Sequence, residues 1–239
     1  MTDHPAFDAA HFSRPCAEVL AEAGWTVGEF PPLPALVDPP SQPVTDASNE
    51  PLVPVHHRRI RVLSSYFHAG WAEARPGAWL RAEAAARLGA VADSLPDRWG
   101  LAVFDAYRPL ALQRELWHAA YDDPGLPEGY VADPVPDPAM PPPHLTGGTV
   151  DLSLTLDGTP LALGTIFDDF RDVAASESLE ATPGPDRELR RMLYWAMHAQ
   201  GFVLLHCEWW HFEFGTRRWA AITGNPARYA AALPPSPPW

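Results

Sequence analysis

Residues that can bind a metal ion stand in two short stretches of this sequence. The stretch HLTGGTVDL places His144 and Asp151 on either side of a glycine pair, and the stretch HCEWWHFEF contains His211. A catalytic zinc ion takes three protein ligands, usually histidines and carboxylates, and leaves a fourth position for water. His144, Asp151 and His211 are therefore the candidate ligands of a metal ion.

Each candidate ligand also has a purely structural interpretation. A lone histidine is more often a surface or core residue than a ligand, and EWWHF could be an aromatic core strand. This interpretation is weakest at Asp151, which would share one face of an alternating strand with Thr149 and Ser153. Gly147 and Gly148 permit a tight backbone path that could turn the imidazole and the carboxylate toward one centre.

Glu208 precedes His211 by three residues in EWWH. On a flat strand these two side chains would point to opposite faces, so a shared site requires the strand to bulge or to end there. A carboxylate beside a metal-activated water is the usual general base of metallohydrolases. Glu208 is therefore a candidate base and need not be a ligand.

A third stretch, FDAYRPLA, places Tyr107 and Arg108 between a predicted strand and a predicted helix. An arginine at such a junction could stabilise the oxyanion of a tetrahedral intermediate or bind a carboxylate with two hydrogen bonds. A salt-bridged structural arginine fits this short motif equally well.

The elements that would position these residues mix helices and strands without a regular βαβ alternation. This order predicts an α+β fold, with a mainly antiparallel sheet flanked by helices. Apolar spacing, proline and glycine positions and a DG turn define the elements. We expect one helix over 78–95 and a second that begins at Pro109 and covers PLALQRELWHAAY. A third helix is expected over 186–201, with Asp186 as N-cap and Gly201 just past the end. The expected strands are 100–107, 149–156, FVLLH and WWHFEF.

Proline is abundant in this chain, with 29 residues, and it is clustered. Clustered proline indicates irregular, stiff chain. We expect a short helix in RPCAEVLAEAGW, ended by Gly24, and then a Pro-rich connector. The predicted division is an N-terminal extension and connector over 1–54 and a catalytic domain over 55–239. The acidic, Pro-rich stretch 122–143 could close over a pocket or be disordered.

Composition limits the classes of function. The chain has 239 residues, 46% of them hydrophobic, with a net charge of −13. An acidic surface repels phosphate backbones, so nucleic-acid binding is not expected. The sequence contains no long apolar run and no secretory signal pattern, so we expect no membrane span and a cytoplasmic location. Two cysteines cannot form a disulfide framework, which agrees with a reducing compartment.

The order of the three motifs resembles the VanX-type D-alanyl-D-alanine dipeptidases, zinc peptidases of family M15 with a Hedgehog/DD-peptidase type of fold. The motifs are DAYRP at 105–109, HLTGGTVDL at 144–152 and EWWH at 208–211, and the resemblance covers roughly residues 60–215. It implies that His144, Asp151 and His211 bind Zn²⁺, that Glu208 is the general base and that Arg108 stabilises the transition state. It also implies that Asp168, in GTIFDDF, binds the substrate's ammonium group, and Tyr107 of the YRP motif is a second candidate for substrate binding.

The sequence departs from this family at the edge of the expected pocket. The family usually has a serine two residues before the first zinc histidine, and here that residue is Pro142, which has no hydroxyl. His206 and Cys207 precede Glu208, and both residue types can bind metals. His206 could add a ligand or carry a proton, or it could be structural. These departures bear more on the identity of the substrate than on the metal site.

The leading hypothesis is a zinc-dependent dipeptidase that acts on D-Ala-D-Ala or a related small dipeptide. Two histidines and one carboxylate also form the ligand set of non-haem Fe²⁺ oxygenases, so a repurposed metalloenzyme, including a biosynthetic tailoring enzyme, is the alternative. A third hypothesis is a metal-containing binding module without catalysis. Glu208 and Arg108 argue against that third hypothesis, because a structural metal site needs neither. The sequence does not indicate the oligomeric state.

Overall fold

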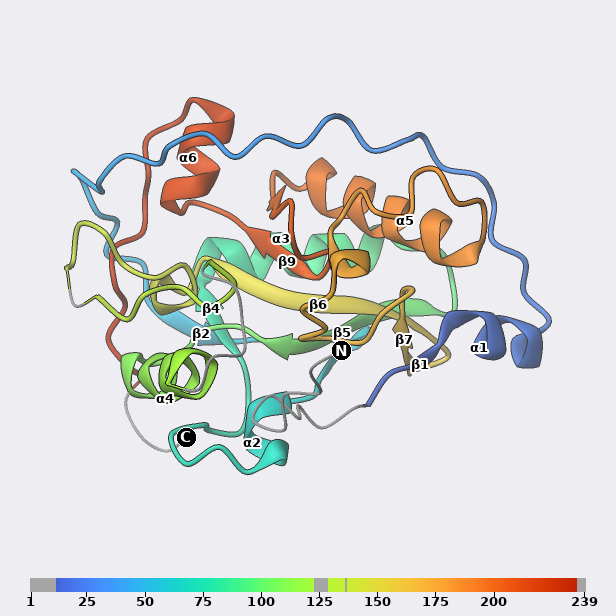
Figure 1. Cartoon of the computed structure of the whole chain (residues 1–239), viewed down its shortest axis with the longest axis horizontal. Coiled ribbons are helices and arrows are strands. Elements are labelled where there is room, and N and C mark those ends of the chain that lie inside the picture. The colour runs from blue at the N-terminus through green and yellow to red at the C-terminus, as the bar shows by residue number, and fades with distance from the viewer. Residues whose placement is uncertain (1–11, 123–128, 136, 236–239) are drawn as a thin grey trace.

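The computed structural model describes residues 12–122, 129–135 and 137–235 (Figure 1). A seven-stranded sheet forms its centre, with the path β1-β7-β6-β5-β3, and β9 pairs with both β6 and β8. The ladders around β6 are antiparallel, whereas β1–β7 and β3–β5 are parallel. The strands of this sheet are β1 (Arg14–Pro15), β3 (Ile60–Val62), β5 (Trp99–Asp105), β6 (Thr149–Leu156), β7 (Thr159–Ala162), β8 (Val203–Leu204) and β9 (His211–Glu213).

Helices cover the sheet, which confirms the predicted α+β fold with a mainly antiparallel sheet. In Figure 1, α3 and α5 lie above the central strands and α2 and α4 lie below them. A separate two-stranded antiparallel sheet joins β2 (Leu52–Pro54) to β4 (Trp79–Arg81). The helices are α1 (Cys16–Ala23), α2 (Ser65–Ala69), α3 (Ala82–Ser94), α4 (Leu110–Tyr121), α5 (Pro185–Ala199) and α6 (Arg217–Thr223), with short 3-10 turns η2 (His144–Thr146) and η3 (Asp172–Ala174).

Strand β6 is the central element of the sheet, and both of its faces are buried. Val150, Leu152 and Leu154 enter the main core, as the alternating pattern predicts. The opposite face carries the polar residues, and the Ser153 hydroxyl donates a hydrogen bond to the carbonyl of Leu161. A buried polar face is unusual because each polar group on it needs a partner. One end of this polar face forms the candidate site.

Two predicted element boundaries differ from the structure. The helix predicted over 78–95 begins at Ala82, because β4 pairs with β2 instead of continuing the helix. Asp186 was expected to cap α5, but Gly184 occupies the cap position and Pro185 is the first helical residue, a position that suits proline. Asp186 lies inside the first turn and accepts a hydrogen bond from the thiol of Cys16. The expected helix end is confirmed, because Gly201 follows it with a φ of 82°.

The predicted strands FVLLH and WWHFEF are shorter in the structure. They are reduced to β8 and β9, and a turn occupies the chain between them. The backbone N–H of His211 donates a hydrogen bond to the carbonyl of Glu208, and that of Leu205 donates to the carbonyl of His211. This turn allows Glu208 and His211 to face the same site, which a continuous strand would prevent.

Residues 25–51 run in extended form along the body of the protein and are called the strap below. In Figure 1 the strap passes over α5 and α6. Its residues 30, 33 and 36 are partly buried, while their neighbours are exposed, and a repeat of three is that of a polyproline II helix. The main-chain N–H groups of Phe30, Leu33 and Leu36 donate hydrogen bonds to the carboxylates of Glu188, Glu180 and Glu177, respectively.

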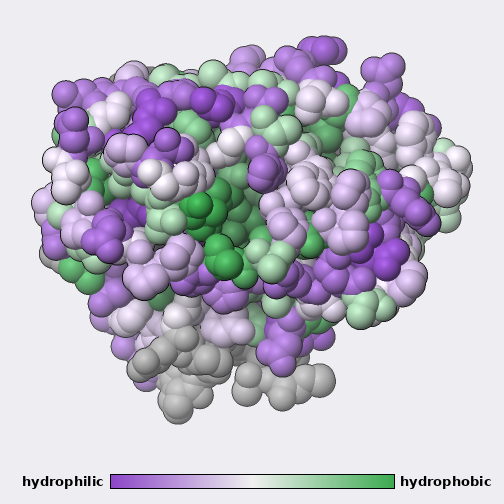
Figure 2. All heavy atoms as spheres, turned by 90° about the horizontal axis from the view of Figure 1, so that it is seen from above, coloured by the Kyte–Doolittle hydropathy of each residue, from purple (hydrophilic) through white to green (hydrophobic). Residues whose placement is uncertain are grey.

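Seen from above, the surface is largely hydrophilic, and hydrophobic residues are visible mainly around a hollow near its middle (Figure 2). Most of the large apolar side chains in the described part of the chain pack into one main core that also includes residues of α1, and a smaller second cluster lies around Tyr107. Among the helices in the described part of the chain, none combines the length and apolar character needed to cross a membrane.

Candidate metal centre and active site

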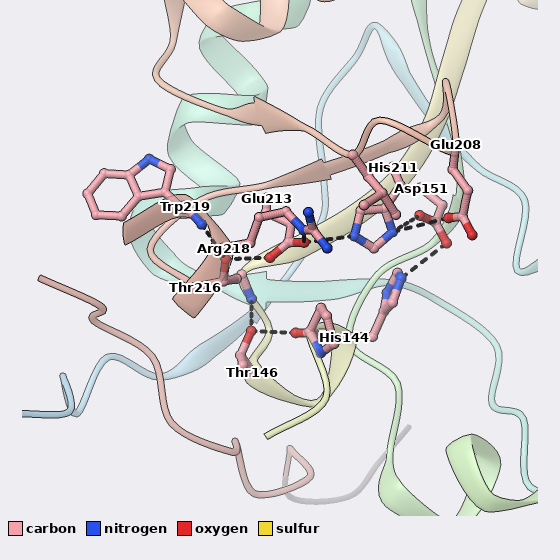
Figure 3. A network of polar contacts seen from close by, with 12 residues as sticks. His144, Thr146, Asp151, Glu208, His211, Glu213, Thr216, Arg218 and Trp219 are labelled. Carbon is pink, nitrogen blue, oxygen red and sulfur yellow. Dashed lines mark hydrogen bonds and ion pairs between the residues drawn. The ribbon is translucent and has the colours of Figure 1, made fainter. Parts of the chain in front are cut away.

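Three candidate ligands meet in the structure. One ligand atom from each of His144, Asp151 and His211 lies within 4.8 Å of the other two, and all three residues are buried. Nε2 of His144 is 3.2 Å from Oδ2 of Asp151, and Nδ1 of His211 is 3.1 Å from Oδ1 of Asp151 (Figure 3). This is the only such cluster of His, Cys, Asp and Glu among the described residues.

The local fold explains why the first two residues converge. His144 begins the 3-10 turn η2, and Gly147 ends that turn with a left-handed φ of 71°. Gly148 lies against the end of β9, because a Cβ atom there would be 2.4 Å from the carbonyl oxygen of Phe214. The chain thus turns back sharply into β6. Asp151 is the third residue of β6, and it pairs directly with His211 of β9.

The polar atoms of this cluster fit a divalent metal ion. Oδ1 of Asp151 is buried and accepts no hydrogen bond of normal geometry from any described residue, although an imidazole nitrogen is close. Burial opposes the ionised form of Asp151, but the two histidines outweigh it and hold its pKa below the usual range. Two imidazoles and one carboxylate are a common protein ligand set for zinc. A cation would satisfy the carboxylate oxygen that the protein leaves unpaired.

The second imidazole of the cluster, that of His211, lies between two carboxylates. Burial lowers the pKa of His211, but its contacts with Asp151 and Glu213 outweigh that effect and raise the pKa to about 10. Nδ1 faces Asp151, and Nε2 faces Oε1 of Glu213 at 3.1 Å. A cation between the ligands would take the place of the proton on Nδ1.

Glu208 lies beside the ligand cluster, with its carboxylate 3.6 Å from Nδ1 of His211. Burial is the main reason why the pKa of Glu208 rises to about 7, and the charge of Asp151 adds to it. A carboxyl group with this pKa can both accept and return a proton near neutral pH.

Arg108 lies on the other side of Asp151, 3.7 Å from its Oδ2. Burial opposes its charge, but Tyr66, Asp105 and Asp151 outweigh burial and raise its pKa. Its Nε donates to Asp105 at 2.8 Å, and one terminal nitrogen donates to Gln113 at 3.0 Å. These contacts fix the guanidinium group next to the cluster.

The structure separates the two residues that the sequence suggested for substrate binding. Asp168 lines the cavity, has a φ of 58°, and accepts a hydrogen bond of 2.8 Å from the hydroxyl of Tyr66. Burial and the charge of Asp151 raise the pKa of Asp168 well above its usual range. Tyr107 instead points away from the cavity, because its hydroxyl donates to the carbonyl of Ala232 and its ring packs in a small second core.

These residues open into one cavity of about 380 Å³. The ligands, Glu208 and Arg108 line it, together with Tyr130 and Val131 from the segment after α4 and with Phe170, all from the described part of the chain. A cavity of this size is typical of a site for a small molecule.

The two unusual residues before Glu208 lie at the rim of this cavity and outside the ligand cluster. His206 is about half exposed, and its Nδ1 is 3.7 Å from Oδ2 of Asp38. Burial raises the pKa of the Cys207 thiol to about 12, so it holds its proton and is a poor ligand. Pro142 is buried, and the neighbouring Pro143 lines the cavity.

Several residues that line the cavity were not singled out from the sequence. Tyr66 reaches the site from α2, Asp38 comes from the strap, and Glu213 follows His211 by two residues on β9. Only Glu213 carried a usable signal, because residues two apart on a strand share a face. The other two are far away in the sequence, and only the fold brings them to the site.

Comparison with known proteins agrees with this geometry. A model of the M15 peptidase family, described as D-ala-D-ala dipeptidase, matches residues 81–225, more than half of the chain. The chain belongs to this family. The matched span contains the three candidate ligands, Glu208, Arg108 and Asp168.

Two relatives carry the same printed name, D-alanyl-D-alanine dipeptidase. The one from Synechocystis sp. is 29% identical over 216 residues, covering 74% of this chain and 87% of that protein. The one from Escherichia coli is 34% identical over 114 residues, covering 47% of this chain and 54% of that protein. The chain is thus a member of a family of peptidases, and it has a buried His-Asp-His cluster suited to a metal ion.

Proposed function

We propose that this chain is a zinc-dependent dipeptidase that hydrolyses D-Ala-D-Ala or a closely related small dipeptide. The observation that carries this proposal is the meeting of His144, Asp151 and His211 with Glu208 and Arg108 in one cavity. The chain's membership of a dipeptidase family supports the same conclusion.

His144, Asp151 and His211 would hold the zinc ion. When bound, zinc supplies a Lewis acid that polarises the scissile carbonyl and lowers the pKa of a water molecule. The protein's part is to keep three ligand side chains rigid and dry, which the burial of all three achieves.

Glu208 is the proposed proton carrier. Its carboxylate takes a proton from the attacking water and later gives it to the amine that leaves. A pKa of about 7 suits both steps, because the group binds and releases a proton with little free-energy difference at neutral pH. The turn over 206–210 directs this side chain toward the ligands.

Arg108 is the proposed stabiliser of the negative charge that develops on the carbonyl oxygen. Its guanidinium group is held by Asp105 and Gln113 before any substrate arrives. A donor fixed in advance does not have to reorganise during the reaction, and such donors contribute strongly to catalysis.

Asp168 and Tyr66 are the proposed site for the substrate's ammonium group. In the free protein the pKa of Asp168 is raised, so the carboxyl group readily keeps a proton. A nearby ammonium group favours the ionised form and thus converts Asp168 into an acceptor and counter-ion. The Tyr66 hydroxyl holds the carboxyl group in place at 2.8 Å.

Turnover of D-Ala-D-Ala by the purified protein tests this proposal. Metal content is determined on the same sample, and Glu208→Gln is assayed in parallel at equal metal occupancy. We expect about one zinc ion per chain, release of free alanine by the wild type, and a fall in kcat of at least about a hundredfold in the variant, as general base catalysis contributes roughly 10²–10⁴-fold.

The outcomes of this test are distinct. Bound zinc without alanine release would reject D-Ala-D-Ala, and a panel of L,L-, D,L- and L,D-dipeptides would then be assayed. Dioxygen consumption with bound iron and no hydrolysis of any dipeptide would replace hydrolysis by the oxygenase alternative.

A further inference from the structure

Glu213 is a buried charged residue that the proposed reaction does not use. It is the last residue of β9, and its side chain is only 1% exposed. Because it follows the ligand His211 by two residues, both side chains lie on the same face of the strand. Oε1 of Glu213 is 3.1 Å from Nε2 of His211 (Figure 3).

This contact determines which nitrogen of His211 is available to a metal ion. An ionised carboxylate can only accept hydrogen bonds, so the proton of a neutral imidazole belongs on Nε2, facing Glu213. The lone pair then lies on Nδ1, which faces Asp151 at 3.1 Å inside the ligand cluster. Carboxylates that contact ligand histidines in this way orient the ring and raise its basicity.

Glu213 is itself held from two sides. Nε of Arg218 donates to Oε1 at 3.0 Å, and the hydroxyl of Thr216 donates to Oε2. Thr216 caps α6, where its side chain accepts a hydrogen bond of 3.2 Å from the backbone N–H of Trp219. Both carboxylate oxygens are therefore satisfied, as a buried charge requires.

The strap reaches this group of residues through Asp38. Arg218 extends from Glu213 toward the cavity rim, where its Nη1 donates to a carboxylate oxygen of Asp38. Asp38 and Arg218 both line the cavity. The strap is anchored two residues before Asp38, where the N–H of Leu36 donates a hydrogen bond to a carboxylate oxygen of Glu177. Ionic contacts thus lead from the strap to a ligand of the metal centre.

We propose that Glu213 is a positioning residue for the metal ligand His211, and that Arg218 and the strap residue Asp38 hold Glu213 in its orientation. This inference rests on the proposed function, because it concerns the metal ion of that site. It assigns the N-terminal strap a part in metal binding although the strap lies outside the span that the family model matches.

Zinc affinity, measured by competition with a chromogenic chelator, tests the proposal in the full-length chain. We expect Glu213→Gln to weaken zinc binding by roughly tenfold or more, which is the usual effect of losing such a partner. Asp38→Asn should weaken it by about twofold to fivefold, because a partly exposed ion pair contributes little. In the double variant with Glu213→Gln and Asp38→Asn, zinc affinity should equal that of Glu213→Gln alone, since Asp38 acts through Glu213.

Matched variants separate positioning from general destabilisation. Glu115→Gln changes a partly buried glutamate on α4 whose carboxylate accepts hydrogen bonds from the N–H groups of Ala72 and Glu73, and Asp46→Asn removes an exposed acid of the same strap. Both should keep the wild-type zinc affinity, and the free energy of unfolding of each metal-free variant is measured in parallel. Glu213→Gln that loses stability but keeps wild-type zinc affinity would overturn the proposal, and equal effects of Asp38→Asn and Asp46→Asn would overturn the role of the strap. A wild-type chain that binds no zinc would instead reject the proposed function.

Discussion

At the scale of single residues, the candidate site combines one carboxyl group whose pKa is lowered with another whose pKa is raised. Contacts with histidines hold the pKa of Asp151 low, whereas burial raises the pKa of Glu208 to about 7. A ligand must be ionised, and a proton carrier must exchange its proton, so the two environments suit the two proposed roles. The burial that tunes Glu208 also destabilises the folded protein whenever that group is ionised.

We therefore expect Glu208→Gln to stabilise the metal-free protein at pH 8. The pKa of Glu208 is raised on folding, so the native state binds this proton more tightly and stability falls as pH rises from about 4.5 through about 7. The variant lacks this loss and should be more stable by about 1–3 kcal/mol at pH 8, with the difference vanishing near pH 4.5. Urea unfolding of both proteins at the two pH values measures it, and equal stability at pH 8 would contradict the burial of an ionised Glu208.

His144, Asp151 and His211 were predicted to be metal ligands from their residue types and spacing and from motifs that resemble those of the M15 dipeptidases, and the structure brings the three side chains together. Glu213 shares a strand face with His211, but its role was not predicted, since a glutamate near a strand end is ordinarily a solvated residue. Asp38 and Tyr66 could not be assigned at all, because a residue type carries no information about which distant segment will pack beside it. The residues that form the candidate metal cluster could thus be named from the sequence, but most of their supporting contacts depend on tertiary structure.

At the scale of elements, the long helices α3, α4 and α5 and the strands β5 and β6 were predictable from apolar periodicity. Four strands, β1, β2, β3 and β4, have two or three residues each. They are defined by pairing with their neighbours, so no local sequence pattern predicts them. The connection from η2 to β6 is the element-level feature that assembles the site. Gly148 makes it possible by packing its bare backbone against the carbonyl of Phe214.

Gly148→Ala should disturb this connection. The new Cβ atom would lie 2.4 Å from the carbonyl oxygen of Phe214 and 2.8 Å from the Tyr229 ring, so the backbone has to move. We expect a loss of about 1–3 kcal/mol in the free energy of unfolding, as is usual for overpacking, together with weaker zinc binding. Gly89→Ala in α3 is the matched change: its Cβ meets only an ordinary contact at 3.9 Å, and it should stabilise the helix by about 0.5–1 kcal/mol. Equal effects of the two changes in urea unfolding would refute this account.

At the scale of the whole molecule, the strap joins regions that the chain order keeps apart. It begins after α1, passes along α5 and reaches α6 (Figure 1). Every third residue from Phe30 to Leu36 donates its main-chain N–H to a glutamate carboxylate of the body. An extended segment with this repeat has few internal contacts, so its position depends on the surface beneath it. The partly buried side chains Phe30, Leu33 and Leu36 pack against the main core.

The strap should consequently contribute to the stability of the whole fold. Leu33 is partly buried against the core, whereas Val37 on the same segment is 58% exposed. We expect Leu33→Ala to lower the free energy of unfolding by about 1 kcal/mol, less than a fully buried leucine would, and Val37→Ala to change it by less than about 0.5 kcal/mol. Urea unfolding followed by tryptophan fluorescence measures both, and both variants should unfold in one transition, because a strap that shares the core unfolds with it. A Leu33→Ala chain as stable as Val37→Ala would mean that the strap rests on the body without supporting it, and the path from Asp38 to the metal centre would then lack a firm anchor.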